Sequence, residues 1–382
     1  MSNPLQELQK QGQSVWYDNI DRAQLQSGQY QRILTDGAIA GVTSNPSIFG
    51  KSISSGHAYD EQISQLLKEG KDTSDVYEAV VIQDVRTVAD MLRPVFERTQ
   101  GQDGYVSLEV SPDLSHDTEG TLSEARRFWK MVERPNLMIK IPATPEGIPA
   151  IKQAISEGIS VNVTLIFSLD SYRAVADAYL SGLEERHGRG EDIHKIASVA
   201  SFFVSRVDTL VDQLLENKIK ASSDPNEQQK LKSLEGKAAI ANARLVYQEF
   251  KRIFGSQRFE SLKQSAEANY QRPLWASTST KNPAYRDVLY AEQLIGPHTV
   301  DTMPLETIES FSDHGNVSLT VENDLQGAKA VFAELEEIGI HYNQVTQQLL
   351  DEGVKKFADA FHQLFNDIKS KQQGIKAGQA TK

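Results

Sequence analysis

The stretch LMIKIPAT, residues 137–144, places a single lysine, Lys140, inside an apolar run of β-strand composition. A proline follows two residues later, so we expect the strand to end there with the lysine near its carboxyl end. Successive side chains of a strand face opposite ways, so Met138 shares one face with Lys140, whereas Ile139 and Ile141 share the other. The β-branched pair suits a face covered by helices, which leaves the lysine for the interior of a barrel.

Seven further apolar or β-branched runs occur along the chain, and stretches of helical pattern separate them. The eight predicted strands are 14–17, 41–44, 104–110, 137–141, 160–167, 198–204, 273–277 and 299–302. Strands that alternate with helices need crossover connections, which give a parallel sheet covered by helices. Eight such units favour an α/β fold of the (β/α)8 TIM barrel type, with additional helices, over an open doubly wound sheet. No glycine-rich nucleotide-binding sequence follows the first strand, which further disfavours the open sheet.

Two long insertions interrupt the alternation, at residues 56–101 and 217–236, and the sequence indicates no role for the second. No linker divides the chain, so residues 1–368 are predicted to form one barrel domain. Residues 369–382 lack apolar anchors, and we expect a disordered C-terminal tail there.

The composition excludes several classes of partner. Of the 382 residues 39% are hydrophobic, and the net charge is −12, which disfavours nucleic acid and anionic membranes as partners. Cysteine is absent, so disulfides and thiolate chemistry are excluded and a reducing compartment fits. The first residues lack the apolar core of a signal peptide, and the apolar runs are too short to cross a bilayer. We therefore expect a cytoplasmic protein.

Polar side chains recur near the ends of the predicted strands. Besides Lys140 they are Asp18, Thr43, Asn45, Glu109, Asn162, Thr164 and Ser201. The carboxyl ends of the strands form the catalytic face of this fold, so these groups would converge on one cavity. Each of them alone, Lys140 included, is explained as well by a structural role, but their shared position is not. Loss of hydration there favours the neutral amine that attacks a carbonyl.

Basic groups that suit a phosphate follow the late strands. Arg206 follows the sixth strand, and Ser279 and Lys281 follow the seventh, where this fold often binds phosphate. A guanidinium offers bidentate contacts and an ammonium acts as a point charge. Lys281 taken alone is explained equally well as a solvated loop cation. The eight histidines and the carboxylates have no metal-ligand spacing, so we expect neither a metal nor a cofactor.

Four segments resemble transaldolase signature sequences, in the order in which that family has them: GVTSNPS at 41–47, IKIPAT at 139–144, VNVTLIFS at 161–168 and ASFFVSR at 200–206. The resemblance is to the longer bacterial subgroup, and it covers the chain from the first to about the eighth predicted strand. It implies a class I aldolase barrel of the pentose phosphate pathway. Such an enzyme moves a dihydroxyacetone unit from sedoheptulose 7-phosphate or fructose 6-phosphate to glyceraldehyde 3-phosphate or erythrose 4-phosphate, through a lysine Schiff base.

The resemblance also implies roles for the residues. Lys140 would form the Schiff base, while Glu109, with a water also held by Thr164, would shuttle protons. Asp18 would take the C4 hydroxyl proton during cleavage, although the nearby Asp21 is an alternative. The implied binding residues are Thr43, Asn45, Asn162 and Ser201 for the dihydroxyacetone unit, and Arg206, Ser279 and Lys281 for the phosphate. Lys281 stands where many members of the family have arginine.

Two alternatives stay open. A Schiff-base fructose 6-phosphate aldolase of the same fold would release free dihydroxyacetone. Phe203 favours transfer, because transaldolases have phenylalanine at this place and the family's aldolases have tyrosine. A non-catalytic phosphosugar-binding barrel would keep Arg206 and Lys281 but would not need Lys140 beside carboxylates. The expected partners are sugar phosphates, and the protein is expected to be a monomer or a homodimer.

Overall fold

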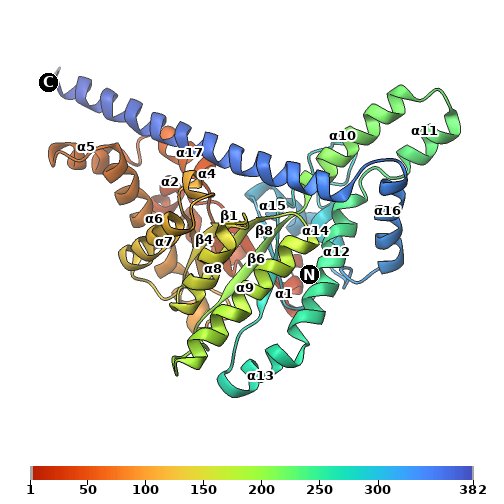
Figure 1. The fold of residues 1–382 in the computed structure, drawn as a ribbon. Coiled ribbons are helices and arrows are strands. Elements are labelled where there is room, and N and C mark those ends of the chain that lie inside the picture. The colour runs from red at the N-terminus through yellow and green to blue at the C-terminus, as the bar shows by residue number, and fades with distance from the viewer. Residues whose placement is uncertain (1–2, 381–382) are drawn as a thin grey trace.

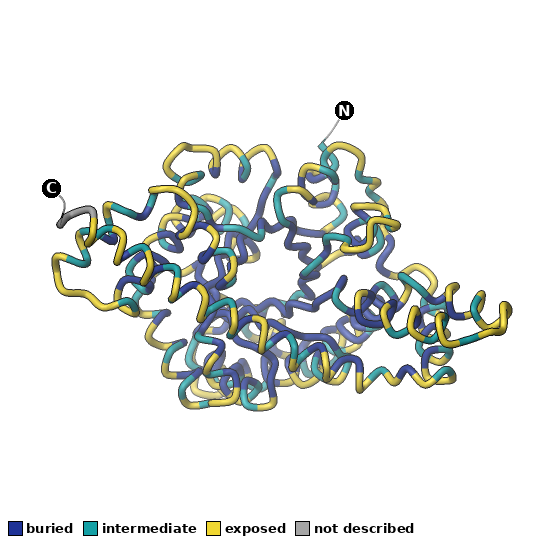
Figure 2. Tube along the Cα trace, turned by 90° about the horizontal axis from the view of Figure 1, so that it is seen from above, coloured by how far each residue is buried: buried dark blue, intermediate teal, exposed yellow. Residues whose placement is uncertain are grey.

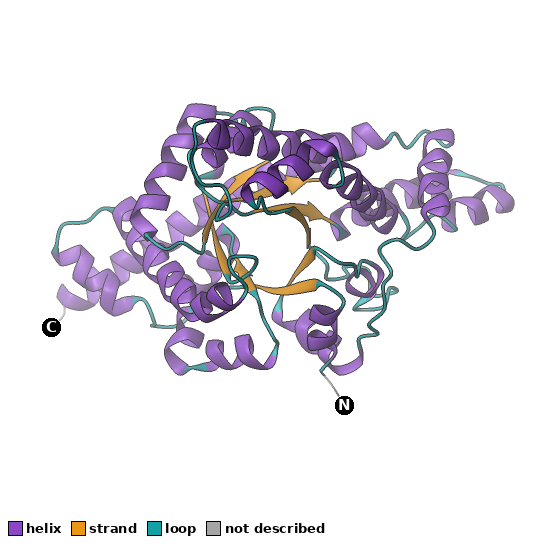
Figure 3. Cartoon of the chain, turned by 90° about the horizontal axis from the view of Figure 1, so that it is seen from below, coloured by secondary structure: helices purple, strands orange, loops and turns teal. Residues whose placement is uncertain are grey.

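The computed structural model describes residues 3–380, in which eight parallel strands close into one barrel (Figures 1 and 3). The strands are β1 (Gln13–Asp18), β2 (Gly41–Thr43), β3 (Tyr105–Glu109), β4 (Leu137–Pro142), β5 (Val161–Ile166), β6 (Ser198–Phe203), β7 (Gln271–Ala276) and β8 (Thr299–Met303). They pair in chain order, and β8 closes the barrel against β1. The predicted TIM barrel is confirmed, and each predicted strand ends within two residues of an observed one.

Helices surround the barrel. They are α1 (Pro4–Lys10), α2 (Arg22–Ser27), α3 (Gln29–Asp36), α4 (Pro46–Ser54), α5 (Asp60–Lys68), α6 (Thr73–Arg98), η1 (Pro112–Leu114), α7 (Thr118–Val132), α8 (Gly147–Ser156), α9 (Leu169–Gly188), α10 (Ser205–Ala221), α11 (Pro225–Lys232), α12 (Ala238–Phe254), α13 (Gln257–Ala266), α14 (Leu289–Gln293), α15 (Leu305–His314), α16 (Leu325–Glu337) and α17 (Tyr342–Ala380). The first insertion forms α5 and α6. The second forms the end of α10 and α11, which project from the barrel (Figure 1). No described helix combines the length and the apolar character that a bilayer crossing requires.

Alternation of side chains along the strands builds two buried layers. The outward-facing Ile139 and Ile141 of β4 are fully buried under the helices, as the sequence pattern predicts, and the strands form the buried centre of the molecule (Figure 2). Inside the barrel, the Trp16 ring lies directly against the backbone of Gly41, where an added Cβ would come within 2.4 Å of it. Only glycine therefore fits at that position of β2.

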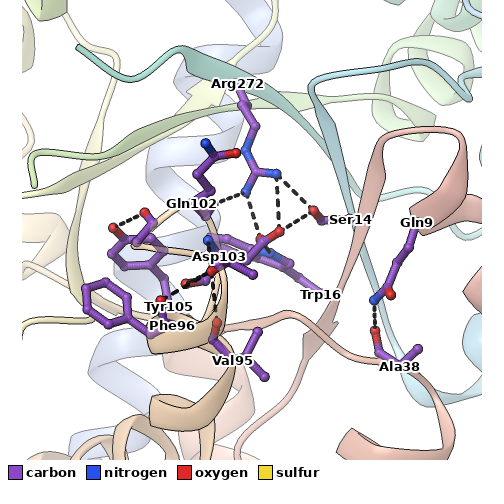
Figure 4. Close-up of polar contacts among 12 residues, drawn as sticks. Gln9, Ser14, Trp16, Ala38, Val95, Phe96, Gln102, Asp103, Tyr105 and Arg272 are labelled. Atoms are coloured by element: carbon purple, nitrogen blue, oxygen red, sulfur yellow. Dashed lines mark hydrogen bonds and ion pairs between the residues drawn. The ribbon is translucent and has the colours of Figure 1, made fainter. Parts of the chain in front are cut away.

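A largely buried ion pair lies at the amino-terminal mouth of the barrel (Figure 4). Arg272 of β7 donates to Asp103, which precedes β3, over 2.8 Å. The same carboxylate accepts hydrogen bonds from the Ser14 hydroxyl at 2.6 Å and from the Trp16 indole at 3.0 Å. The ion pair therefore connects β1, β7 and the segment before β3 at the end opposite the predicted catalytic face.

Helix α17 crosses the other end of the barrel and continues to Ala380 (Figure 1). The expected disordered tail is thus wrong for residues 369–380, and residues 381–382 lie outside the described part of the chain. Polar contacts with the first insertion hold this segment: Lys371 pairs with Asp60 at 2.8 Å, and Thr73 donates to Gln372 at 2.9 Å. Ile375 also packs against the hydrophobic core, so the segment has an apolar anchor that was not predicted from the sequence.

We predict that Asp103→Ala lowers the free energy of unfolding by about 3–5 kcal/mol, because the largely buried Arg272 guanidinium then has no counter-charge. Chemical denaturation measures the change. The control is Asp90→Ala, which removes an exposed partner of Arg134 and should cost at most about 1 kcal/mol. Equal losses in the two variants would contradict the prediction.

Candidate active site

A cavity of about 230 Å³ opens at the carboxyl ends of the strands. Most of the residues predicted from the sequence line it: Asp18, Thr43, Asn45, Lys140, Thr164, Ser201, Phe203, Arg206, Ser279 and Lys281. Glu109 and Asn162 do not line the cavity but lie directly behind it, in contact with Lys140 and Ser201. The convergence expected from the strand ends is therefore present, and it gathers residues from every strand except β3, whose Glu109 lies just beneath.

Lys140 and Glu109 form a buried pair under the cavity. The parallel register of β3 and β4 sets the two residues side by side. Each side chain is only 6% exposed, and Nζ of Lys140 lies 3.4 Å from Oε2 of Glu109. The ammonium also donates to the carbonyl oxygen of Ser44 at 3.1 Å. The lysine is thus fixed in place and has a proton acceptor within reach.

Burial changes the acidity of Glu109. Loss of hydration raises its pKa to about 7, although the charge of Lys140 acts in the opposite direction. Its Oε2 has no hydrogen-bond partner among the described residues, and neither does the hydroxyl of Thr164. Thr164 lies where the pairing of β5 with β6 shifts register, and such irregularities often redirect a side chain beside an active site. Two polar atoms without a hydrogen bond to the described residues, one of them in the ion pair with Lys140, suit a bound hydroxyl or water.

Asp18 is the second carboxyl group at the cavity. Its side chain accepts a hydrogen bond from the Thr43 hydroxyl at 2.6 Å, and that hydroxyl lies 2.7 Å from the one of Thr302. Burial raises the pKa of Asp18, against the effect of Lys140. Asp21 instead accepts the backbone N–H of Gln24 at 2.9 Å and so caps α2. Of these two carboxyl groups, Asp18 lines the cavity and Asp21 does not.

Two asparagines were predicted to bind substrate, and the structure places them differently. Asn45 lines the cavity, but its Oδ1 accepts the N–H of Ile48 and caps α4, which leaves its Nδ2 for a hydroxyl. Asn162 is fully buried: it donates to Ser107 at 2.9 Å and accepts from Ser201 at 2.7 Å. Its amide orients the hydroxyl of Ser201, which does line the cavity.

Cationic groups lie at another part of the same cavity. The guanidinium of Arg206 lies over the ring of Phe203, at 4.9 Å, and its Nη1 is buried without a partner in the described chain. Burial lowers the pKa of Arg206. Ser279 and Lys281 line the cavity from the segment after β7. A desolvated guanidinium with no bound carboxylate attracts an anion, and its fork geometry suits phosphate.

The structure adds five lining residues that the sequence did not indicate: Ala276, Ser277, Thr302, Pro304 and Phe357. The sequence could have indicated Thr302, because it lies near the carboxyl end of the eighth strand, just as Thr43 lies at the end of the second. Phe357 could not, because it lies on α17, far along the chain from any strand. Its ring centre is 5.3 Å from Nζ of Lys140 and 5.8 Å from the guanidinium of Arg206. The C-terminal helix therefore supplies an apolar wall over the lysine.

Comparison with known proteins assigns the chain to a family. A family model described as transaldolase/fructose-6-phosphate aldolase matches residues 15–368. The chain belongs to the transaldolase/fructose-6-phosphate aldolase family. It is 48% identical to a transaldolase of Trichodesmium erythraeum (strain IMS101), over 97% of this chain and 98% of that protein. A transaldolase of Parafrankia sp. (strain EAN1pec) is also 48% identical, over 97% and 98%. Transaldolase 2 of Streptomyces avermitilis is 46% identical, over 98% and 99%.

Membership of this family accords with the chemistry of the cavity. An amine held among carboxyls and hydroxyls can form an imine with a ketone, and an imine stabilises the carbanion left when a carbon–carbon bond breaks. Across residues 3–380, no group of three His, Asp or Glu side chains could hold a metal ion. The cavity of this family member thus contains groups for both covalent catalysis and proton transfer.

We predict that kcat/KM rises with pH through about 7, the pKa of Glu109, because only the ionised carboxylate can take a proton from the Lys140 ammonium. In Glu109→Gln the rate should fall by about 10²–10⁴-fold and this inflection should disappear. Steady-state rates between about pH 5.5 and 8.5 in buffers of equal ionic strength measure both effects. A variant that keeps the same inflection would exclude Glu109 as its source.

Proposed function

We propose that the protein is a transaldolase that transfers a dihydroxyacetone unit from sedoheptulose 7-phosphate or fructose 6-phosphate to an aldose phosphate, through a Schiff base on Lys140. One observation carries the proposal: a buried lysine beside Glu109 shares a small cavity with Arg206 and Lys281. A ketose phosphate has a carbonyl at one end and a phosphate at the other, and this cavity offers a partner to each. The sequence relatives named transaldolase support the same activity.

The proposed reaction begins at the carbonyl carbon of the donor. Nζ of Lys140 forms a bond to C2, and the carbonyl oxygen leaves as water after Glu109 has transferred the protons that this step requires. The C3–C4 bond then breaks, and its electron pair moves into the iminium to give an enamine. Asp18 takes the C4 hydroxyl proton, and the aldose phosphate departs. The acceptor aldehyde enters, and the same steps run in reverse.

The remaining cavity groups bind the substrate in this proposal. Asn45 and Ser201 contact hydroxyls of the dihydroxyacetone unit, while Thr164 and Glu109 hold the water that relays protons. Thr43 fixes Asp18, and Asn162 acts by orienting Ser201. Arg206, Ser279 and Lys281 bind the phosphate, with the ammonium of Lys281 acting as a point charge.

Transfer, as opposed to release of free dihydroxyacetone, requires the enamine to avoid protonation by water. Two apolar rings support transfer. Phe203 and Phe357 both line the cavity, and their ring centres lie 6.5 Å apart. Neither ring can hold a water by a strong hydrogen bond, so the acceptor aldehyde is favoured over a proton from solvent.

We propose a cytoplasmic enzyme in which residues 1–368 form one barrel domain, acting as a monomer or a homodimer and without contact with nucleic acid. Sugar phosphates are its proposed substrates. The boundary at residue 368 falls inside α17, so the helix that ends the domain also extends beyond it.

The first test is a coupled assay of fructose 6-phosphate with erythrose 4-phosphate, which follows the glyceraldehyde 3-phosphate formed. Wild type should be active, and Lys140→Ala should lose at least about 10³-fold in kcat, because the amine that forms the imine is removed. Borohydride with fructose 6-phosphate should label Lys140 covalently. The control is Lys263→Ala, which removes a lysine at the opposite mouth of the barrel. An inactive wild type without labelling would instead favour a phosphosugar-binding barrel.

A second test concerns transfer against release. Phe357→Ala should raise the ratio of free dihydroxyacetone released to dihydroxyacetone transferred by roughly tenfold, because water gains access to the enamine. The two products can be separated by chromatography after incubation with donor and acceptor. Phe361→Ala, which removes a ring one turn further along α17, is the control. An unchanged ratio in Phe357→Ala would exclude its ring as the barrier to water.

A further inference from the structure

The segment that follows β7 makes hydrogen bonds to carboxylates that lie outside the cavity. Residues 277–290, which we term the phosphate segment, carry Ser279 and Lys281. Three of its hydroxyls donate to carboxylates: Thr278 to Asp301 at 2.8 Å, Tyr285 to Asp212 at 2.7 Å, and Tyr290 to Asp208 at 2.8 Å. None of these six residues lines the cavity, so the proposed reaction uses none of them directly.

Two of the three acceptors lie on the helix that carries Arg206. Asp208 and Asp212 belong to α10, which begins at Ser205. Asp208 follows Arg206 by about half a helical turn, and Asp212 follows it by about one and two-thirds turns. One rigid helix therefore holds the guanidinium proposed for the phosphate and also two bonds to the segment with Lys281. Ser205 adds a backbone hydrogen bond to the carbonyl of Ser277 at 3.0 Å.

The second insertion takes part in the same arrangement. Asp212 accepts the backbone N–H of Gly236, the last residue of that insertion, at 2.9 Å. Gly236 has a φ of +69°, and a Cβ there would come within 2.7 Å of the Tyr285 ring. The insertion thus ends on a glycine because the tyrosine packs against its backbone. Asp212 joins three parts of the chain: α10, the end of the insertion and the phosphate segment.

The phosphate segment begins in a conformation that needs support. Ser277 has a φ of +58°, in the left-handed region that non-glycine residues rarely adopt. Its hydroxyl lies 2.9 Å from that of Ser205. Lys281 itself has a flexible side chain on an exposed part of the segment, so its position relative to Arg206 depends on the segment's anchors.

We propose that Tyr285, through Asp212 and Gly236, is a positioning residue that holds Ser279 and Lys281 at the correct distance from Arg206 and so sets the affinity for the substrate phosphate. The inference rests on the proposed function, in which these three groups bind that phosphate. The proposal also gives the second insertion a role, because its last residue, Gly236, packs against the ring of Tyr285. Tyr285 is half-buried, so its hydroxyl can be removed without opening the core.

Tyr285→Phe tests the proposal, because it removes the hydrogen bond and keeps the ring on Gly236. KM for fructose 6-phosphate and the inhibition constant of inorganic phosphate should both rise about three- to tenfold, as expected for the loss of one ordinary hydrogen bond. The value of kcat should stay within about twofold of wild type. Borohydride trapping of free dihydroxyacetone on Lys140, which needs no phosphate contact, should proceed at the wild-type rate.

Two further variants make the result interpretable. Tyr172→Phe removes a buried hydroxyl that has no hydrogen-bond partner in the described chain, and it should change neither KM nor phosphate inhibition. Lys281→Ala should raise both constants. If Lys281→Ala raises them and Tyr285→Phe does not, the positioning role is wrong and the phosphate site stands. If neither variant changes them, the phosphate assignment and the positioning role both fail. If Tyr285→Phe instead slows dihydroxyacetone trapping as much as it slows catalysis, its role is general stability, which also overturns the proposal.

Discussion

The pairing of Lys140 with Glu109 is the interaction on which the rest of the site depends. Burying an isolated ammonium is costly, and a carboxylate 3.4 Å away offsets much of that cost. The parallel register of β3 and β4 pairs Glu109 with Lys140, so the two side chains lie at the same height in the barrel. A closed barrel then turns the pair inward and surrounds it with the ends of the other strands. The fold therefore makes a buried amine tolerable at the place where it can react.

The electrostatics of the cavity separate proton transfer from anion binding. Glu109 and Asp18 both interact with the charge of Lys140, and burial raises the pKa of each carboxyl group, that of Glu109 to about 7. Arg206 lies close enough to affect Glu109 only weakly, and its Nη1 has no partner within the described chain. Its charge is therefore available to a substrate. Although the net charge of the protein is −12, three cationic side chains line this cavity, and their local field favours an anionic sugar.

The sequence predicted the barrel and most of the site because both follow from local patterns. Period-two alternation placed Lys140 inside, and the proline after it marked the end of β4. Contacts between distant segments were beyond such patterns. Phe357 reaches the cavity because α17 crosses the barrel, and residues 369–380 form a helix that is held by polar contacts with the first insertion and by packing of Ile375 on the core. Asn162 was correctly placed on an inward face, but its amide is taken up by Ser107 and Ser201, which periodicity cannot show.

The strands and the segments outside them contribute different parts of the site. The strands supply the amine and the carboxyl groups, whose positions the parallel register fixes. In the proposed mechanism, water exclusion and phosphate geometry depend instead on elements outside the strands: α17 brings Phe357 over the lysine, and the second insertion ends against Tyr285. Covalent chemistry requires positions fixed by rigid strands, whereas the choice of acceptor and the fit to phosphate depend on surfaces that can vary between relatives. In such a barrel the strands can therefore support the same reaction while the insertions and the C-terminal helix determine which substrates bind.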